Sequence, residues 1–316
     1  MDNCRKTTIE YIADSGSAHI VVICGGMSTE REVSLSSSVA VIDSLVKQDY
    51  RVTKIDMGYD IANSLYKVKP DIVFNCLHGT YGEDGALPGL LNIMRIPYTH
   101  SGLLPSAISF NKEYSEKIFR HNGLRVPDHV IISNKNLQHT QIMKAPYVIK
   151  PLTQGSSIGI EIVFPEDQYN ILDYKFEYGD VVMLEQYIKG KEIQVAVLDG
   201  KALGTMEIKL LKRRFYDYDT KYTDGYAEHL YPGRITEQQI EEVKLLAEKA
   251  NRVVGASGIT RVEFILSERD HQFYLLEINT HPGFTPLSIC PEIAKYNNIN
   301  FDRLVKKLVE TAKYES

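Results

Sequence analysis

The sequence predicts an α/β protein whose second half is α+β, and three observations lead to this fold class. In residues 19–103, short apolar runs alternate with helical patterns, which is typical of parallel strands joined by crossover helices. Hairpin patterns instead dominate the part of the chain after residue 188. A chain of 316 residues is also long for one hydrophobic core, so we expect three domains, at 1–103, 104–188 and 189–316.

The first domain begins with the apolar strand HIVVIC at 19–24. A helix is expected at 34–48, then a strand at 50–56 and a buried strand at 70–79. This alternation predicts a parallel sheet with helices as the connections.

The middle domain begins with a helix at 110–123. Strands at 146–151 and 156–164 follow, joined by a very short loop. A helix at 166–178 and a strand at 180–188 complete this part. Mixed or antiparallel sheets are therefore expected in the second and third domains.

The third domain opens with a hairpin at 192–208, because Asp199-Gly200 is a strong two-residue turn signal. Residues 212–234 are polar and have no periodicity. Loops longer than about 12–15 residues in compact domains are often functional lids, so we expect a lid here, against the plainer interpretation of a surface loop.

A capping box from Thr236 to Gln239 predicts the start of an amphipathic helix that ends near Gly255. A second hairpin is expected at 261–279 and a final helix at 291–314.

Composition excludes several classes of protein. The net charge of −5 argues against nucleic acid as a partner, because such binders usually carry a basic excess. No apolar run approaches the roughly 18 residues that a membrane span needs, and the N-terminus lacks the apolar region of a signal peptide. The four scattered cysteines form no paired framework, so we expect a cytoplasmic protein.

Two carboxylates are expected to face each other on the last hairpin. If Leu266 pairs with Tyr274, Glu263 lies opposite Glu277. Opposed carboxylates repel each other on a sheet, and a divalent cation would turn this repulsion into a binding site.

The same register places Arg261 opposite Asn279, which adds an amide oxygen to the two carboxylates. Such a set of oxygen ligands suits Mg²⁺. The alternative is a solvated sheet face on which Arg261 neutralises both acids. The apolar surroundings and the following Pro282-Gly283 favour the metal site.

A glycine-rich stretch at 150–159 suits phosphate but is not a Walker loop, because Lys150 precedes the glycines and a strand pattern follows. We expect a hairpin tip that folds over phosphates, against the alternative of a plain surface hairpin. Taken alone, Lys112 is expected to be a solvated helix residue, and Lys221 lies in the aperiodic stretch.

The turn after the first strand does not support a dinucleotide site. Gly25-Gly26 lacks the GxGxxG spacing, and Asp56 follows too far along the chain to be the ribose ligand. Glu30 could be a helix-start acid, and a lone His78 after the third strand is more often structural than catalytic.

Several motifs together resemble the ATP-grasp enzymes and, within them, the D-alanine–D-alanine ligases. They occur in the family's order from residue 19 onward: GGMSTEREVSL (25–35), LHGTYGEDG (77–85), YTHSG (98–102), Asn111-Lys112, KPLTQGSSIG (150–159), LEQYIKGKE (184–192), FYDYDTKY (215–222), RVEF (261–264) and LLEINTHPGFT (275–285). The resemblance implies a three-domain ATP-grasp architecture that clasps ATP between the central and C-terminal domains.

The implied reaction is ATP-dependent ligation of two D-alanines through an acyl phosphate, for peptidoglycan precursors, with release of ADP and phosphate. By position, Glu30 resembles the residue that holds the first D-alanine's ammonium group, networked with Ser156 and Tyr222. Arg261 and the Gly283 N–H would stabilise the oxyanion, which contributes about 3–4 kcal/mol per donor.

The resemblance also implies binding residues. His78 would lie near the first D-alanine, and Ser288 and Ile289 would contact the second. Glu263, Glu277 and Asn279 would bind two Mg²⁺ ions, with Mn²⁺ able to substitute. The ATP-binding residues that it implies are Lys112, Lys150, Ser157, Glu185, Tyr187, Ile188, Glu192, Phe215, Lys221 and Leu276.

Two departures from the family pattern stand out. Glu263 occupies a position where Asp is the more familiar ligand, and His281 one where a small or apolar residue is expected, so we expect a pH-dependent charge there. Tyr222 favours D-alanine over D-lactate as the second substrate. The remaining alternatives are a non-catalytic nucleotide-binding module and a dehydrogenase. The family further suggests a homodimer.

Overall fold

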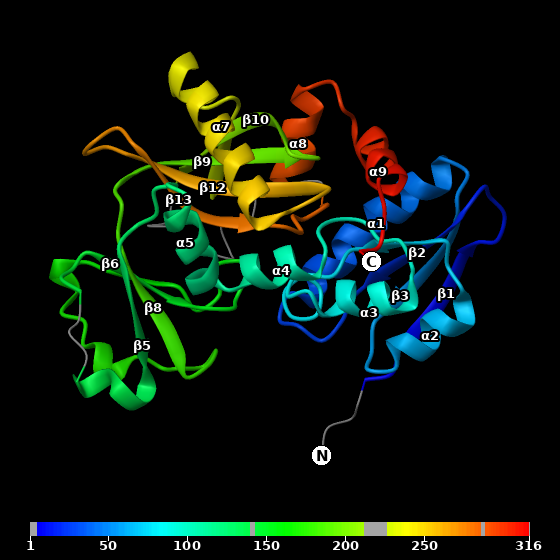
Figure 1. The fold of residues 1–316 in the computed structure, drawn as a ribbon, viewed down its shortest axis with the longest axis horizontal. Coiled ribbons are helices and arrows are strands. Elements are labelled where there is room, and N and C mark those ends of the chain that lie inside the picture. Colours follow the sequence, from blue (N-terminus) through cyan, green and yellow to red (C-terminus); the bar gives the residue numbers. More distant parts are fainter. Residues whose placement is uncertain (1–4, 140–142, 212–225, 286–287, 316) are drawn as a thin grey trace.

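The computed structural model describes residues 5–139, 143–211, 226–285 and 288–315. Figure 1 shows the sheets of the first and middle domains side by side, with the sheet of the third domain above that of the middle domain. Within the described residues, no helix combines the length and the apolar character that a membrane span requires.

The first sheet has the order β1-β3-β2-β4. Its strands are β1 (Thr8–Ala13), β2 (His19–Cys24), β3 (Arg51–Asp56) and β4 (Ile72–Asn75). The parallel pairing of β2 with β3 and β4 confirms the expected core of the sheet. The expectation of a wholly parallel sheet is wrong at one edge, because β1 pairs antiparallel with β3. That strand lies before residue 19, where the family motifs begin.

Four helices accompany this sheet: α1 (Arg31–Lys47), α2 (Ile61–Val68), α3 (Ala86–Met94) and α4 (Leu103–Phe110). The first helix is a crossover between parallel strands, as its place between two apolar runs predicts.

The central sheet is antiparallel and has the order β5-β8-β6-β7. It consists of β5 (His129–Ser133), β6 (Tyr147–Pro151), β7 (Glu161–Val163) and β8 (Val181–Gln186), preceded by α5 (Lys112–His121) and interrupted by the 3-10 helix η1 (Asn134–His139). Because β6 and β7 pair directly, the loop between them is a hairpin tip, as expected. It covers residues 152–160, so the very short loop and the strand expected from residue 156 are wrong.

The helix expected at 166–178 is wrong. Two single 3-10 turns, η2 (Pro165–Asp167) and η3 (Ile171–Asp173), occupy this stretch. Gln168 adopts a left-handed conformation (φ 47°) and the Asn170 side chain accepts from the Leu172 N–H, so both residues favour turns over a continuous helix.

The third sheet is antiparallel, in the order β11-β10-β9-β12-β13. Its strands are β9 (Gly190–Leu198), β10 (Lys201–Leu210), β11 (Ala227–Leu230), β12 (Ile259–Ser267) and β13 (Phe273–Asn279). The expected turn at Asp199-Gly200 joins β9 to β10.

Helices cover both faces of the third sheet (Figure 1). On one face, α7 (Glu237–Val254) shares a core with Val195 and Phe264, and the predicted capping box of Thr236 and Gln239 is present. On the other face, α8 (Ile289–Tyr296) shares a core with Ala196 and Met206.

The expected final helix at 291–314 is two helices, since α9 (Phe301–Glu310) is separate from α8. Asn298 has a left-handed backbone (φ 61°) between them, and the Asn300 side chain accepts from the Arg303 N–H at 2.9 Å as the cap of α9. The left-handed residue Asn298 and the cap Asn300 therefore interrupt the helical run and start a new helix.

One hydrophobic core joins the first and third sheets. Val22 and Leu45 of the first sheet and its α1 belong to the same buried cluster as Met206 of β10, Ile293 of α8 and Leu308 of α9. The C-terminal segment also returns to the first domain, where the Tyr98 N–H donates to the Lys313 carbonyl at 3.2 Å. The first domain and the end of the chain are therefore packed as one body.

The two strands of the last hairpin pair with a one-residue slip. Glu263 lies opposite Glu277 and Arg261 opposite Asn279, as predicted. The expected pairing of Leu266 with Tyr274 is wrong, because Leu266 lies opposite Phe273. The extra residue falls on β13, between Leu275 and Glu277, and this geometry is a β-bulge.

Candidate active site

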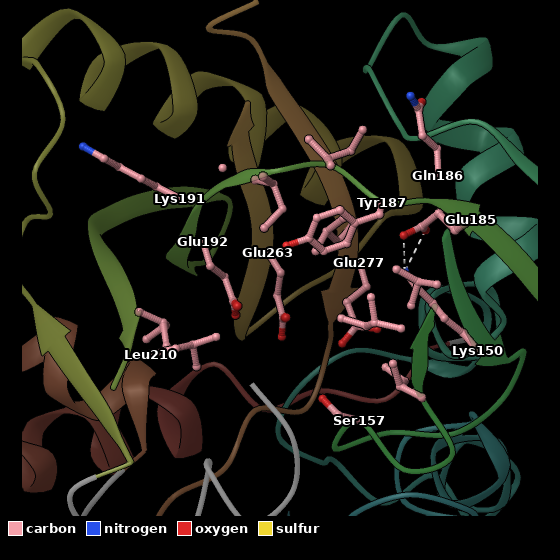
Figure 2. Close-up of a pocket in the computed structure, with 18 of the residues that line it drawn as sticks. Lys150, Ser157, Glu185, Gln186, Tyr187, Lys191, Glu192, Leu210, Glu263 and Glu277 are labelled. Carbon is pink, nitrogen blue, oxygen red and sulfur yellow. Dashed lines mark hydrogen bonds and ion pairs between the residues drawn. The ribbon is translucent and has the colours of Figure 1, made fainter. Parts of the chain in front are cut away.

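A cavity of about 460 Å³ lies between the central and third sheets, and both contribute side chains to it. Figure 2 shows Glu192, Glu263 and Glu277 extending from the third sheet toward the same space, with Lys150 and Glu185 of the central sheet beside them. The sequence-predicted residues that line this cavity are Lys112, Lys150, Ser157, Glu185, Tyr187, Ile188, Glu192, Glu263, Leu276 and Glu277.

The bulge in β13 explains why two consecutive residues face the cavity. In a regular strand, Leu276 and Glu277 would point to opposite faces of the sheet. Here both line the cavity, whereas Leu275 and Ile278 on either side are buried in the core with α7. The slip therefore places an apolar side chain and a carboxylate next to each other on the cavity wall.

Each carboxylate of the acid pair has a cationic neighbour. The Arg261 guanidinium donates to Glu263 Oε1 from Nη2 at 2.5 Å and from Nε at 3.0 Å. Burial by itself lowers the pKa of Arg261, but the Glu263 carboxylate outweighs it and raises that pKa. Arg261 also acts electrostatically on Glu277, but both acids line a cavity and Glu263 is buried, so the solvated-face alternative does not describe this pair.

The second acid, Glu277, is 3.3 Å from Lys112 Nζ, which also donates to the Gln154 carbonyl at 2.8 Å. Lys112 is only 6% exposed, so the expectation of a solvated helix residue is wrong. It begins α5, and its partners come from residues far along the chain. A buried lysine costs free energy unless negative charge compensates it, and an anionic ligand in the cavity would add to the compensation that Glu277 provides.

The set of Glu263, Glu277 and Asn279 fits a hard divalent cation. All three offer oxygen atoms from adjacent strands, and the two carboxylates lie opposite each other at one register position beside a cavity. The Asn279 Oδ1 atom accepts from the His281 N–H at 2.7 Å, which orients the amide and leaves a second lone pair on that oxygen.

Lys150 and Glu185 form a buried ion pair on the central sheet. Lys150 Nζ lies 2.6 Å from the Glu185 carboxylate, and both side chains are almost fully buried. Burial alone lowers the pKa of Lys150, but Glu185 and the nearby Glu116 outweigh it, so its pKa is raised. Burial raises the pKa of Glu185. Figure 2 shows this pair at the edge of the cavity.

The tip of the β6–β7 hairpin reaches the first domain. The Ser156 hydroxyl donates to Glu30 Oε1. Glu30 is the N-cap residue of α1, at the helix start as expected, although its carboxylate makes no capping hydrogen bond to that helix. A side chain at Gly155 would lie 3.0 Å from Glu30 Oε2, so the tip packs closely against this acid. Ser156 and Ser157 both have positive φ, at 49° and 59°.

The expected substrate-binding residues lie beside this contact. His78 Nδ1 is 3.3 Å from Glu83 Oε1, and both side chains are buried. A side chain at Gly283 would lie 2.8 Å from Ser288 Oγ and 3.9 Å from His78 Cε1, so only glycine fits there without displacement. Ile289, the first residue of α8, packs its side chain into the core, which leaves its backbone for any ligand contact.

His281 was expected to add a pH-dependent charge, and its buried position opposes that charge. Burial, together with His100 and His78, lowers the pKa of His281 well below its ordinary value. The predicted Phe215, Lys221 and Tyr222 lie outside the described residues.

Several residues that line the cavity were missed. Ile265, Lys209 and Leu210 line it, as does Glu207, whose buried carboxylate accepts from the Arg234 backbone N–H at 2.8 Å. A signal for one of them was available, because Ile265 lies two residues after Glu263 on the same strand and so shares its face.

Comparisons with known proteins agree with this geometry. The family model described as "D-ala D-ala ligase N-terminus" matches residues 59–101, and "D-ala D-ala ligase C-terminus" matches residues 118–310. The chain is 56% identical over 312 residues to the D-alanine–D-alanine ligase of Rickettsia akari (strain Hartford), covering 99% of this chain and 98% of the relative.

Among solved structures, the D-alanine–D-alanine ligase from Bacillus anthracis matches with a TM-score of 0.81 and 31% identity, over 93% of this chain and 97% of that one. Its complex with ATP matches with a TM-score of 0.78 and 28% identity, over the same shares. The VanG D-Ala:D-Ser ligase from Enterococcus faecalis matches with a TM-score of 0.77 and 27% identity, over 93% and 98%. The chain belongs to the D-alanine–D-alanine ligase family.

Proposed function

We propose that this chain joins two D-alanines into D-alanyl-D-alanine at the expense of ATP, for peptidoglycan synthesis. The family relationship supports the activity. The observation that carries the assignment to this site is that Glu263 and Glu277 share one cavity with Lys112 and Lys150. Opposed acids and buried lysines together suit a triphosphate with its metal ions.

ATP occupies the cavity between the central and third sheets in this proposal. Lys112 and Lys150 neutralise phosphate oxygens, and their burial strengthens that interaction. Tyr187, Ile188 and Leu276 supply apolar contacts to the base. The other nucleotide contacts in the proposal are Ser157, Glu185, Glu192, Phe215 and Lys221.

Glu263, Glu277 and Asn279 hold two Mg²⁺ ions, which Mn²⁺ can replace. Bound there, the metal supplies positive charge to the phosphate oxygens during transfer. Two nitrogens of Arg261 donate to Glu263 Oε1, and this contact orients the Glu263 side chain, which is one methylene longer than the more familiar Asp.

The first D-alanine lies under the hairpin tip. Glu30 binds its ammonium group, Ser156 and Tyr222 orient Glu30, and His78 lies beside the substrate. The carboxylate of this D-alanine attacks the γ-phosphorus, and ADP leaves. The product of this step is an acyl phosphate, which is lost to hydrolysis unless water is excluded. The 212–234 segment was expected to be the lid that excludes it; because Ala227–Leu230 form β11 of the third sheet, the part before β11 is proposed for this role.

The second D-alanine binds near Ser288 and the backbone of Ile289, at the start of α8. Its free amine attacks the acyl carbon, and the C–N bond forms as the tetrahedral oxyanion develops. Arg261 and the Gly283 N–H stabilise that oxyanion, after which the C–O bond to phosphate breaks and phosphate leaves.

We further propose that the enzyme acts in the cytoplasm as a homodimer, with domains at 1–103, 104–188 and 189–316. The ATP requirement supports the location. Gel filtration with light scattering tests the dimer, and a monomeric mass at working concentration would contradict it.

Phosphate release tests the function directly. ATP and Mg²⁺ are mixed with D-alanine, L-alanine, or D-alanine plus D-lactate or D-serine, and phosphate is measured over time. We expect release with D-alanine alone and none above background with L-alanine. No release with D-alanine would contradict the proposal. A clear preference for D-lactate or D-serine as the second substrate would reassign the specificity.

A further inference from the structure

A buried cluster of two histidines and one glutamate lies at the substrate residues, and of the three only His78 has a place in the proposed reaction, beside the first D-alanine. His78, Glu83 and His281 each offer one ligand atom, and these atoms lie within 4.8 Å of one another. All three residues are at most 7% exposed. His78 comes from the loop after β4 and His281 from the loop after β13, so the fold brings them together.

The hydrogen bonds of His281 leave one ring nitrogen available as a ligand. His281 Nε2 lies 2.8 Å from the Asn75 carbonyl, which can only accept, so Nε2 carries the proton. The other nitrogen, Nδ1, is buried and has no hydrogen-bond partner among the described residues. A buried lone pair without a donor costs free energy, and a metal ion would relieve that cost.

His78 has a matching arrangement. Its Nδ1 atom is 3.3 Å from Glu83 Oε1, while its Nε2 atom is 3.3 Å from Ser37 Oγ. Metal-binding histidines usually use one nitrogen as the ligand and donate the other to a carbonyl or hydroxyl oxygen. Both histidines of this cluster fulfil that condition. The spacing between His78 Nδ1 and Glu83 Oε1 is also close to the roughly 3.4 Å that separates two ligands of a tetrahedral zinc ion.

We propose that His78, Glu83 and His281 form a site for a zinc-class divalent metal, separate from the oxygen-ligand site of Glu263, Glu277 and Asn279. Two imidazoles and one carboxylate select Zn²⁺ over Mg²⁺, because Mg²⁺ prefers oxygen ligands. The three ligand atoms lie within 4.8 Å of one another, so small side-chain movements bring them to zinc-binding distance.

The place of the cluster gives the metal an effect on catalysis. A side chain at Gly155 would lie 3.4 Å from Glu83 Oε2, so the hairpin tip that contacts Glu30 also covers the cluster. A bound ion would hold His78 away from the first substrate. We therefore expect Zn²⁺ to inhibit the ligase.

The direct test is a Zn²⁺ titration of the full chain, freed of metal and of any affinity tag, by calorimetry in excess Mg²⁺. We expect one site per chain that His281→Gln weakens at least tenfold. Glutamine keeps a donor near the position of Nε2 for the Asn75 carbonyl and removes the Nδ1 ligand. Co²⁺ gives a second readout, as visible absorption of a nitrogen-ligated ion that His281→Gln removes.

The matched control is His100→Asn. His100 stacks on His281 at 4.1 Å between ring centroids but is not one of the three ligands, and asparagine can keep its bond to Thr99 Oγ1. We expect zinc binding within about twofold of wild type. Should His281→Gln fail to fold, Glu83→Gln replaces it, with the same expected loss.

Three results would overturn the proposal: no zinc bound by the wild type, unchanged binding in a folded His281→Gln chain, or loss of the site in Glu277→Gln, which would place zinc among the oxygen ligands. Inhibition of phosphate release by Zn²⁺, reduced in His281→Gln, is a further expected result. Only that inhibition rests on the proposed function, since the titration needs no substrate.

Discussion

At the scale of single residues, the acid pair shows how the chain holds like charges together. Glu263 and Glu277 lie directly opposite each other on β12 and β13, and each has a cation from a different element beside it. Arg261 and Lys112 therefore reduce the repulsion between the two carboxylates in the folded chain. Both acids can then stay ionised and available to metal ions.

Glu277→Gln should reduce kcat by more than about 100-fold, because loss of even an outer-shell partner of a metal commonly costs 10–100-fold. Phosphate release measures the rate, and thermal unfolding checks that the fold is intact. Glu241→Gln is the control, since Glu241 forms an ion pair with Lys244 on the exposed face of α7, away from the cavity. An unchanged rate in Glu277→Gln would remove this residue from the metal site.

The stability of the central domain should depend on Glu116 in a pH-dependent way. Glu116 Oε2 lies 2.5 Å from His129 Nδ1, and this carboxylate raises the pKa of His129. A histidine whose pKa rises on folding contributes stability that is fully present below its unfolded pKa of about 6.5 and is lost as the pH rises through the folded value.

Glu116→Gln should therefore lower the melting temperature more at pH 6 than at pH 9, as measured by calorimetry at both values. His129→Gln is the matched variant, and the same pH dependence should vanish with it. A destabilisation that is equal at both pH values would show that His129 does not contribute through its charge.

At the scale of elements, the bulge gives neighbouring residues of β13 opposite roles. Leu276→Ala removes an apolar contact from the cavity, so we expect a severalfold higher KM for ATP with kcat within about twofold. Leu275→Ala instead leaves a hole in the core and should destabilise the fold by about 2–5 kcal/mol. Steady-state kinetics and denaturant unfolding separate the two. Similar effects from both variants would contradict the assignment of faces.

The first turn of α7 depends on its cap. The Thr236 hydroxyl accepts from the Gln239 N–H at 3.2 Å, and the Gln239 side chain accepts from the Thr236 N–H at 3.0 Å. Thr236→Ala should lower the free energy of unfolding by about 1 kcal/mol, whereas Thr236→Ser should be close to neutral. Urea unfolding measures both, and equal losses would mean that the hydroxyl is not the stabilising group.

The sequence predicted elements where period and end signals agree. The strand 19–24, the turn at Asp199-Gly200 and the capping box of α7 all have local causes, and each is present. The helix expected at 166–178 failed because Gln168 and Asn170 adopt turn conformations.

The site was predictable in part, for the same reason. Strand alternation placed Glu263 and Glu277 together, because their relation depends on one hairpin. The burial of Lys112 could not be read from the sequence, since its partners are Gln154 and Glu277. The bulge did leave a trace, because the β13 residues that belong to the core shared with α7 are Phe273, Leu275 and then Ile278, which breaks the spacing of two.

At the scale of the whole molecule, α9 connects the end of the chain to the first domain. Leu308 is 1% exposed in the core that the first and third sheets share. Leu308→Ala should lower the free energy of unfolding by about 2–5 kcal/mol and keep a single transition for that shared body. Two separate transitions, with the third sheet unaffected, would contradict a shared core.

The division of the hydrophobic cores also determines which part of the enzyme can open. The core cluster of the central sheet is built from residues 130–184, while Phe119 of α5 and Leu124 pack with the third sheet. A hinge is therefore expected near residues 126–129 and 186–190, where the chain enters and leaves the central sheet. The central sheet would then rotate away from the third sheet to admit the nucleotide. Such a rotation requires that the hydrogen bond between Ser156 and Glu30 break in each catalytic cycle.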